Sequence, residues 1–176
     1  GIKVSGEVCP HHFTLTEDDI VAGDANYKMN PPLRAKEDVE ALKIGLRDGI
    51  MEVISTDHAP HTAEEKKKDL NHAPFGIVGT ETAAALTYTE LVQKGYLDPM
   101  GMAEKMSTNP ARILGIDKGD ISEGHIADIV IFDPRASYEI HAKDFASKGK
   151  NTPFEGREVT GRVVTTILDG QVVYRA

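Results

Sequence analysis

The sequence changes from apolar to polar along the stretch Met51-Glu-Val-Ile-Ser-Thr-Asp-His-Ala-Pro-His61. Its apolar start, Met51 to Ile54, has the length of a buried strand, and Pro60 prevents the strand from continuing. Three side chains that can ligate a metal or transfer a proton follow this run: Asp57, His58 and His61. Because α/β barrels keep their chemistry at the C-terminal ends of buried parallel strands, the stretch predicts an α/β fold with a site at this strand end.

A strand and a helix are predicted before this stretch. Residues 2–9 alternate loosely between apolar and polar side chains, which indicates a strand. Residues 36–48 predict a helix, because Val39, Leu42 and Leu46 share one helical face and Gly49 stands where a C-terminal cap belongs. With a second strand predicted at 51–57, the order strand, loop, helix, strand is half of a parallel α/β repeat.

The stretch is followed by a long polar loop, residues 58–79. Its charged part, Glu64 to Asp69, is interpreted as a solvated face. Its end, Ala73 to Gly79, is small, apolar and rich in glycine, and glycines let a backbone come close to a ligand. On these residues alone a plain loop is an equally good interpretation of Ala73 to Gly79.

The second half of the chain predicts helices and then strands. One helix is expected at about 80–94, another where Asp98 caps Pro99, and a third from Asn109-Pro110 to near Gly115. Beyond Lys118 the chain is rich in β-branched residues, with strands expected at 129–132, 159–166 and 171–174. Asp169-Gly170 between the last two is a strong hairpin signal.

Composition and charge exclude several classes of function. The 176 residues are 40% hydrophobic and 27% charged, as expected of a globular protein. A net charge of −8 argues against binding of nucleic acid or of anionic membranes. No apolar run approaches the roughly 20 residues of a membrane span. Cys9 is the single cysteine, which excludes an internal disulfide and favours a reducing compartment such as the cytoplasm.

Five stretches carry a family resemblance: Glu7-Val-Cys-Pro-His-His12, Lys28-Met-Asn-Pro-Pro-Leu-Arg34, Thr56-Asp-His-Ala-Pro-His61, Pro74-Phe-Gly-Ile-Val-Gly79 and Asn151-Thr-Pro-Phe154. In this order they resemble the C-terminal part of bacterial class I dihydroorotases, zinc enzymes of the amidohydrolase superfamily. The segment Gly119 to Asp128 also resembles the β-sandwich segment of that superfamily.

The resemblance implies a fold. Residues 1–117 would be the C-terminal part of a (β/α)8 metal-dependent hydrolase barrel, with its last two strands and helices. Residues 118–176 would be the C-terminal part of a small β-sandwich domain. The chain opens at Gly1-Ile-Lys-Val without an initiator Met, so we expect a cut N-terminus. Both parts would expose faces that the missing part of the family's barrel and sandwich covers. Such exposed faces predict self-association, and hence a homo-oligomer.

The resemblance also implies an activity and its residues. The family reversibly cyclises N-carbamoyl-L-aspartate to L-dihydroorotate in de novo pyrimidine synthesis, with Zn²⁺ as cofactor. Asp57 matches a metal ligand that also acts as general base and acid. Asn30 and His61 match substrate-binding residues, and Phe75 and Gly76 match a loop whose backbone contacts the substrate ring.

Each of these residues also has a structural interpretation. Asp57 and His61 would then be loop residues, and Asn30 a turn former before Pro31. His58 is equally well explained by packing or by support of a metal ligand. We expect supporting roles for three further residues. His11 and His12 would support the end of the strand, and Arg34 would form a salt bridge.

The chain departs from the family in its metal ligands. It contains no His-x-His pair, and only Asp57 of the expected ligand set is present, whereas zinc sites take three or four protein ligands. We therefore expect residues 1–176 alone to be inactive. Two other functions stay open. One is a non-catalytic dihydroorotase-like subunit that scaffolds aspartate transcarbamoylase, and the other is a related cyclic amidase such as a hydantoinase or allantoinase.

Overall fold

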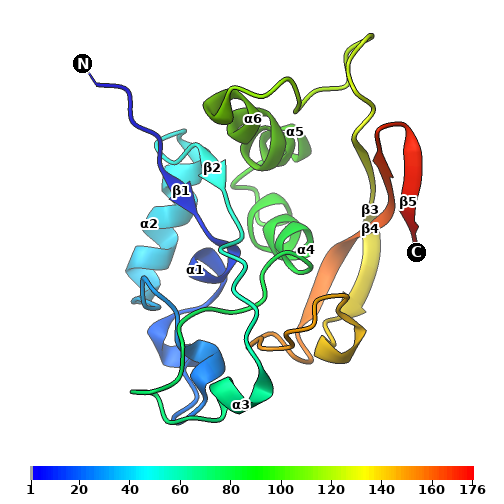
Figure 1. The fold of residues 1–176 in the computed structure, drawn as a ribbon. Helices are drawn as coiled ribbons and strands as arrows, with labels where there is room; N and C mark the ends of the chain where they lie inside the picture. Colours follow the sequence, from blue (N-terminus) through cyan, green and yellow to red (C-terminus); the bar gives the residue numbers. More distant parts are fainter. Residues whose placement is uncertain (1) are drawn as a thin grey trace.

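The computed structural model describes residues 2–176. Two sheets flank a set of central helices (Figure 1). On one side lies a parallel pair of short strands, and on the other an antiparallel sheet of three strands in the order β3-β4-β5. None of the helices in this described part is long and apolar enough to cross a membrane.

The parallel pair is shorter than predicted. Strands β1 (Glu7–Val8) and β2 (Val53–Ile54) pair with Val8 opposite Ile54. The predictions of strands at 2–9 and 51–57 are therefore wrong in their extent. A strand extends only as far as a neighbouring strand satisfies its backbone groups, and β1 has a partner on one side alone. Asp57, with a φ of 46°, breaks the extended conformation after β2.

The helices of the first half follow local signals closely. Helix α1 (Pro10–Thr14) starts directly after β1, with Pro10 in its first turn, and Thr16 caps η1 (Glu17–Asp19). A further turn, η2 (Ala25–Tyr27), precedes α2 (Lys36–Arg47), which confirms the predicted helix at 36–48. Gly49 has a φ of 77° after the end of α2, as its capping position requires.

The central helices form two continuous runs, the first as predicted for about 80–94 and the second more continuous than predicted beyond Asp98. After α3 (Ala63–Lys66), α4 (Ala83–Thr87) runs directly into the π-turn η3 (Tyr88–Val92). Likewise α5 (Pro99–Ala103), η4 (Glu104–Thr108) and α6 (Asn109–Leu114) form one run. The predicted helix from Asn109-Pro110 to near Gly115 is confirmed by α6, which ends at Gly115 with a φ of 66°. It does not start from a loop, because the π-turn η4, which pairs residues five apart, precedes Pro110 and accommodates a residue without an N–H.

The antiparallel sheet consists of β3 (Ile129–Glu139), β4 (Glu158–Leu168) and β5 (Gln171–Arg175), with η5 (Ala142–Asp144) between the first two. Strand β3 is longer than the predicted 129–132, because a register shift between Asp133 and Ser137 accommodates Pro134 inside the strand. The predicted hairpin is confirmed, and both Asp169 and Gly170 have positive φ angles of 49° and 75°.

Two clusters of buried side chains form the core. One joins β1, α1, α2 and β2 to the central helices: Val8, Phe13, Leu46, Ile54 and Leu91. The other contains side chains from both the first part of the chain and the last: Leu15, Met29, Leu33, Ile77, Ala85, Leu86, Ile140, Phe154 and Val159. Residues 140–159 therefore pack against the elements that precede residue 87.

A buried carboxylate links three parts of this arrangement. Glu90, on η3, is 3% exposed. It accepts hydrogen bonds from Lys43 of α2 at 3.0 Å and from Arg157, before β4, at 2.9 Å. Lys94 also donates to it. Burial by itself would raise the pKa of Glu90, but the hydrogen bonds from Lys94 and Lys43 outweigh it and hold the pKa below its ordinary value.

We predict that Glu90→Gln destabilises the protein by about 3 kcal/mol, because Lys43 would keep a buried charge without a counter-charge. Chemical denaturation at neutral pH measures this difference. Since the pKa of Glu90 is depressed, its contribution is present above the ordinary value of 4.5 and is lost as the pH falls through the folded-state pKa.

The exposed Glu64→Gln on α3 is the matched control and should change the free energy of unfolding by less than about 0.5 kcal/mol. An equal loss for both variants, or a loss for Glu90→Gln that does not shrink in acid, would contradict the prediction.

Candidate active site

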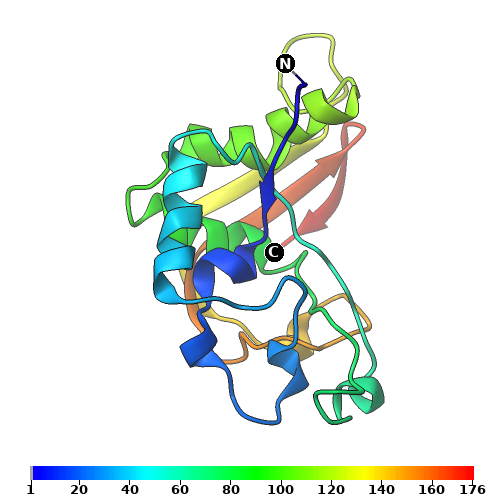
Figure 2. The same cartoon turned by 90° about the vertical axis from the view of Figure 1, so that its left-hand side faces the viewer.

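The predicted polar residues lie at the C-terminal end of β2. In both views the loops that follow β1 and β2 gather with α3 at the same end of the molecule (Figures 1 and 2). Asp57 is exposed there. Its carboxylate is near enough to Cys9, after β1, to help raise the pKa of that thiol to about 11, although burial is the main cause. The Sγ of Cys9 also lies 3.7 Å from the Oγ of Ser55, so the ends of the two parallel strands meet.

His58 links the end of β2 to the end of the glycine-rich segment Ala73 to Gly79. Its Nδ1 accepts hydrogen bonds from the backbone N–H groups of Gly79 at 3.2 Å and Thr80 at 3.4 Å. A Cβ on Gly79 would stand 2.4 Å from the carbonyl oxygen of Thr56, so only glycine fits there. These contacts agree with the interpretation of His58 as a supporting residue.

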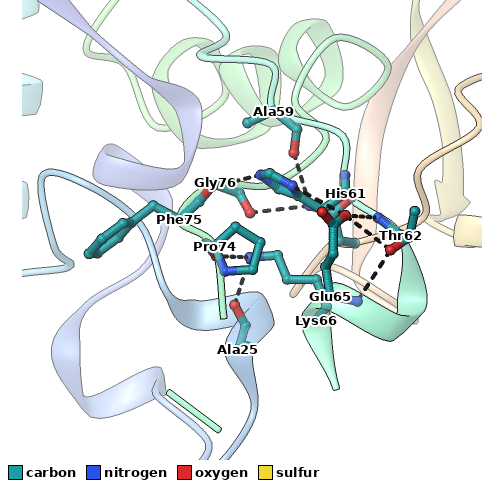
Figure 3. A network of polar contacts seen from close by, with 10 residues as sticks. Ala25, Ala59, His61, Thr62, Glu65, Lys66, Pro74, Phe75 and Gly76 are labelled. Atoms are coloured by element: carbon teal, nitrogen blue, oxygen red, sulfur yellow. Dashed lines mark hydrogen bonds and ion pairs between the residues drawn. The ribbon is translucent and has the colours of Figure 1, made fainter. Parts of the chain in front are cut away.

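His61 and the segment Pro74 to Gly76 lie together, as expected for parts of one site (Figure 3). The Nε2 of His61 is 3.0 Å from the carbonyl oxygen of Phe75. Its Nδ1 is 3.7 Å from the carboxylate of Glu65. The ring of Phe75 is 54% exposed, and Lys28 Nζ lies 4.4 Å from its centre.

Any residue larger than glycine at position 76 would force the loop to move. The φ of Gly76 is 102°, and a Cβ would lie 2.4 Å from the Cβ of Ala59. Its N–H donates to the carbonyl of Lys28 at 2.9 Å. This bond brings the segment that contains Asn30 next to Gly76.

Asn30 is exposed, and the backbone on either side of it is held in place. Lys28 is bound to Gly76 on one side, and the Nε2 of His12 donates to the carbonyl of Pro31 at 2.8 Å on the other. His12 thus supports the Asn30 loop from the end of β1, which is the kind of role expected of it. Arg34 forms an exposed pair with Asp38 at 3.7 Å, also as expected.

Asn151 is a residue of this site for which the sequence suggested no role. It is 6% exposed. Its Oδ1 accepts from the N–H of His61 at 2.9 Å, while its Nδ2 donates to the carbonyls of Ala59 at 3.0 Å and Gly76 at 3.1 Å. Its backbone carbonyl accepts from Val78. The motif Asn151-Thr-Pro-Phe154 was the only signal, because the residues that it binds are far away in the sequence.

The expected zinc site is incomplete in this chain. Within residues 2–176, Asp57 belongs to no group of three side chains that could hold a metal. Cys9, His11 and His12 do bring their ligand atoms within 4.8 Å of one another. Burial lowers the pKa of His11 to about 3, so its imidazole is neutral. This cluster does not include Asp57, so the described residues supply Asp57 alone to the expected zinc site.

Comparison with known proteins identifies relatives along nearly the whole chain. A sequence model of the Amidohydrolase family matches residues 10–173. A dihydroorotase from Pelotomaculum thermopropionicum is 52% identical over 98% of this chain and 40% of its own length. One from Bacillus cereus is 51% identical over 99% of this chain and 41% of its own length. The chain thus spans about two fifths of the curated relatives that it matches.

Solved structures of similar fold are named dihydropyrimidinase or hydantoinase. A dihydropyrimidinase from Brevibacillus agri superimposes with a TM-score of 0.91 at 30% identity, covering 97% of this chain and 39% of that one. An L-hydantoinase from Arthrobacter aurescens gives 0.88 at 32% identity, with coverage of 97% and 39%. These similarities confirm the predicted fold class, part of an α/β barrel of the amidohydrolase type.

We predict that Asn151→Asp destabilises the protein by about 3 kcal/mol, because a carboxylate would face the carbonyl oxygens of Ala59 and Gly76, to which the amide now donates. Amide hydrogen exchange should become faster in residues 59–61 and 76–78. Asn71→Asp, an exposed substitution with the same change in charge, is the control. It should leave the free energy of unfolding and the rate of amide hydrogen exchange unchanged. Equal exchange in the two variants would contradict the bridging role.

Proposed function

Because this chain belongs to the amidohydrolase family, we propose that the full-length protein is a dihydroorotase. It would interconvert N-carbamoyl-L-aspartate and L-dihydroorotate in de novo pyrimidine synthesis. The observation that carries this proposal is identity of about 50% to dihydroorotases over nearly the whole chain, against about 30% to the dihydropyrimidinase and hydantoinase structures. The activity is proposed for the full-length protein, because the chain spans only two fifths of those relatives.

We propose that Asp57 is a metal ligand and the general base and acid of the reaction. Zinc would polarise the carbonyl under attack when bound. The remaining ligands would come from residues outside 2–176, since the described residues complete no site around Asp57. An exposed carboxylate at the strand end can take a proton from the attacking water and return it to the leaving amide nitrogen.

We propose that Asn30, His61 and the backbone of Phe75 and Gly76 bind the substrate. Support comes from contacts that join the three segments. His61 lies against the carbonyl of Phe75, and the N–H of Gly76 holds the loop that carries Asn30. An amide side chain, an imidazole and backbone groups together offer the hydrogen bonds that a substrate with two carboxylates needs.

The remaining proposals concern the context of the full-length protein. We propose that residues 1–117 and 118–176 belong to its barrel and its sandwich domain, and that it works in the cytoplasm, in keeping with one free, buried cysteine. We further propose self-association. Exposed apolar residues on the antiparallel sheet support it: Val130, Ile131, Val172 and Val173. Aspartate transcarbamoylase is the proposed partner if the protein is a scaffold.

The second candidate function is that of a related cyclic amidase, favoured by the close superposition on a dihydropyrimidinase. Turnover of dihydroorotate and of hydantoin by the full-length protein separates the two. We expect dihydroorotate to be preferred. A preference for hydantoin would establish the second candidate, and turnover of neither would favour the scaffold.

We predict that Asp57→Asn in the full-length protein lowers kcat for dihydroorotate about a thousandfold, because the amide can neither accept nor return the proton. Steady-state kinetics measures this loss. Asp18→Asn, an exposed change on η1, is the control and should keep the wild-type kcat. Retention of more than about a tenth of the activity by Asp57→Asn would contradict the assigned role.

A further inference from the structure

The charged segment Glu64 to Asp69 is not uniformly solvated, contrary to the sequence-based expectation. Lys66 is 8% exposed, whereas Lys67 and Lys68 beside it are exposed. The Nζ of Lys66 donates to the carbonyl of Ala25 at 3.0 Å and to the carbonyl of Pro74 at 3.0 Å. Its ammonium therefore connects α3 to η2 and to the segment that precedes Phe75 (Figure 3).

Burial of this ammonium is unfavourable on its own. Both acceptors are neutral carbonyl groups, and burial lowers the pKa of Lys66 to about 8. The nearby charge of Lys28 lowers it further and that of Asp24 opposes the shift. An apolar side chain of the same length would avoid the cost of desolvation. A contribution to stability therefore does not explain why the ammonium of Lys66 is buried here.

Helix α3 holds its two ends against neighbouring carbonyl groups. It begins at Ala63, two residues after His61, and Thr62 and Glu65 cap each other reciprocally, which fixes the single turn. At its start, His61 contacts the carbonyl of Phe75, and at its end Lys66 contacts the carbonyl of Pro74. His61, just before the helix cap, and Lys66, at the helix end, thus hold two consecutive peptide groups of the glycine-rich segment.

We propose that Lys66 is a positioning residue for substrate binding. Its ammonium orients the Pro74–Phe75 peptide and, through it, the backbone of Phe75 and Gly76 that faces the substrate. This inference rests on the proposed function of that backbone, and it adds a residue that touches no substrate atom itself.

The test compares Lys66→Met and Lys66→Arg with Lys67→Met in the full-length protein. Lys66→Met keeps the length of the side chain and removes the donor. We expect it to raise KM about tenfold with kcat changed less than threefold, the pattern of lost uniform binding. Lys66→Arg restores a buried cation with donors for both carbonyls and should return KM to within about threefold of wild type. Lys67→Met should leave KM unchanged.

A second readout does not depend on activity. Lys66→Met should speed amide hydrogen exchange of Phe75 and Gly76 about tenfold, and Lys67→Met should not. KM is measured with whichever of dihydroorotate or hydantoin the wild-type protein turns over. Failure of the proposed dihydroorotase function is thus visible in the wild type, whereas failure of this inference is visible only in the variants.

Several outcomes overturn the inference. It fails if Lys66→Met has a wild-type KM and wild-type exchange at Phe75 and Gly76. It also fails if Lys66→Met lowers the Tm while KM stays unchanged, since Lys66 would then support the scaffold alone. If Lys66→Met does not fold, Lys66→Arg decides, and a raised KM in a folded Lys66→Arg protein overturns it. Failure of both variants to fold overturns it as well.

Discussion

The site depends on the buried carboxamide of Asn151. The loops beyond β2 leave the N–H of His61 and the carbonyls of Ala59 and Gly76 without partners in any sheet, and such groups are costly to bury unpaired. One side chain with an acceptor and two donors satisfies all three. Because Asn151 belongs to the segment between β3 and β4, the loops can take their shape only when the end of the chain packs against its beginning.

Close backbone contacts follow from this bridge. With both loops bound to one amide, Gly76 lies against Ala59, and Gly79 against Thr56, at distances that a Cβ would not allow. His58 then binds the N–H of Gly79, and His61 contacts the carbonyl of Phe75, both in the glycine-rich segment. The result is a set of backbone and side-chain groups whose positions are determined from both sides, as a binding site requires.

Charge burial supports the same arrangement at two places. Glu90 binds cations from α2, from the turn after η3 and from the segment before β4 at one point in the core. Lys66 acts on the opposite principle, since its buried cation is bound by neutral carbonyls. The first pattern suits a structural connection and the second suits the positioning of a backbone segment, because a charged donor binds a carbonyl group more strongly than a neutral donor does.

The sequence by itself determined the features that depend on neighbouring residues. The period of Val39, Leu42 and Leu46 and the cap at Gly49 defined α2, Asp169-Gly170 defined the hairpin, and the motifs around Asp57 pointed to the amidohydrolase family. Only the tertiary structure decided the short extent of β1 and β2, the burial of Lys66 and the role of Asn151. The physical reason is that strand extent, burial and hydrogen bonding are set by partners far along the chain, 90 positions away for His61 and Asn151.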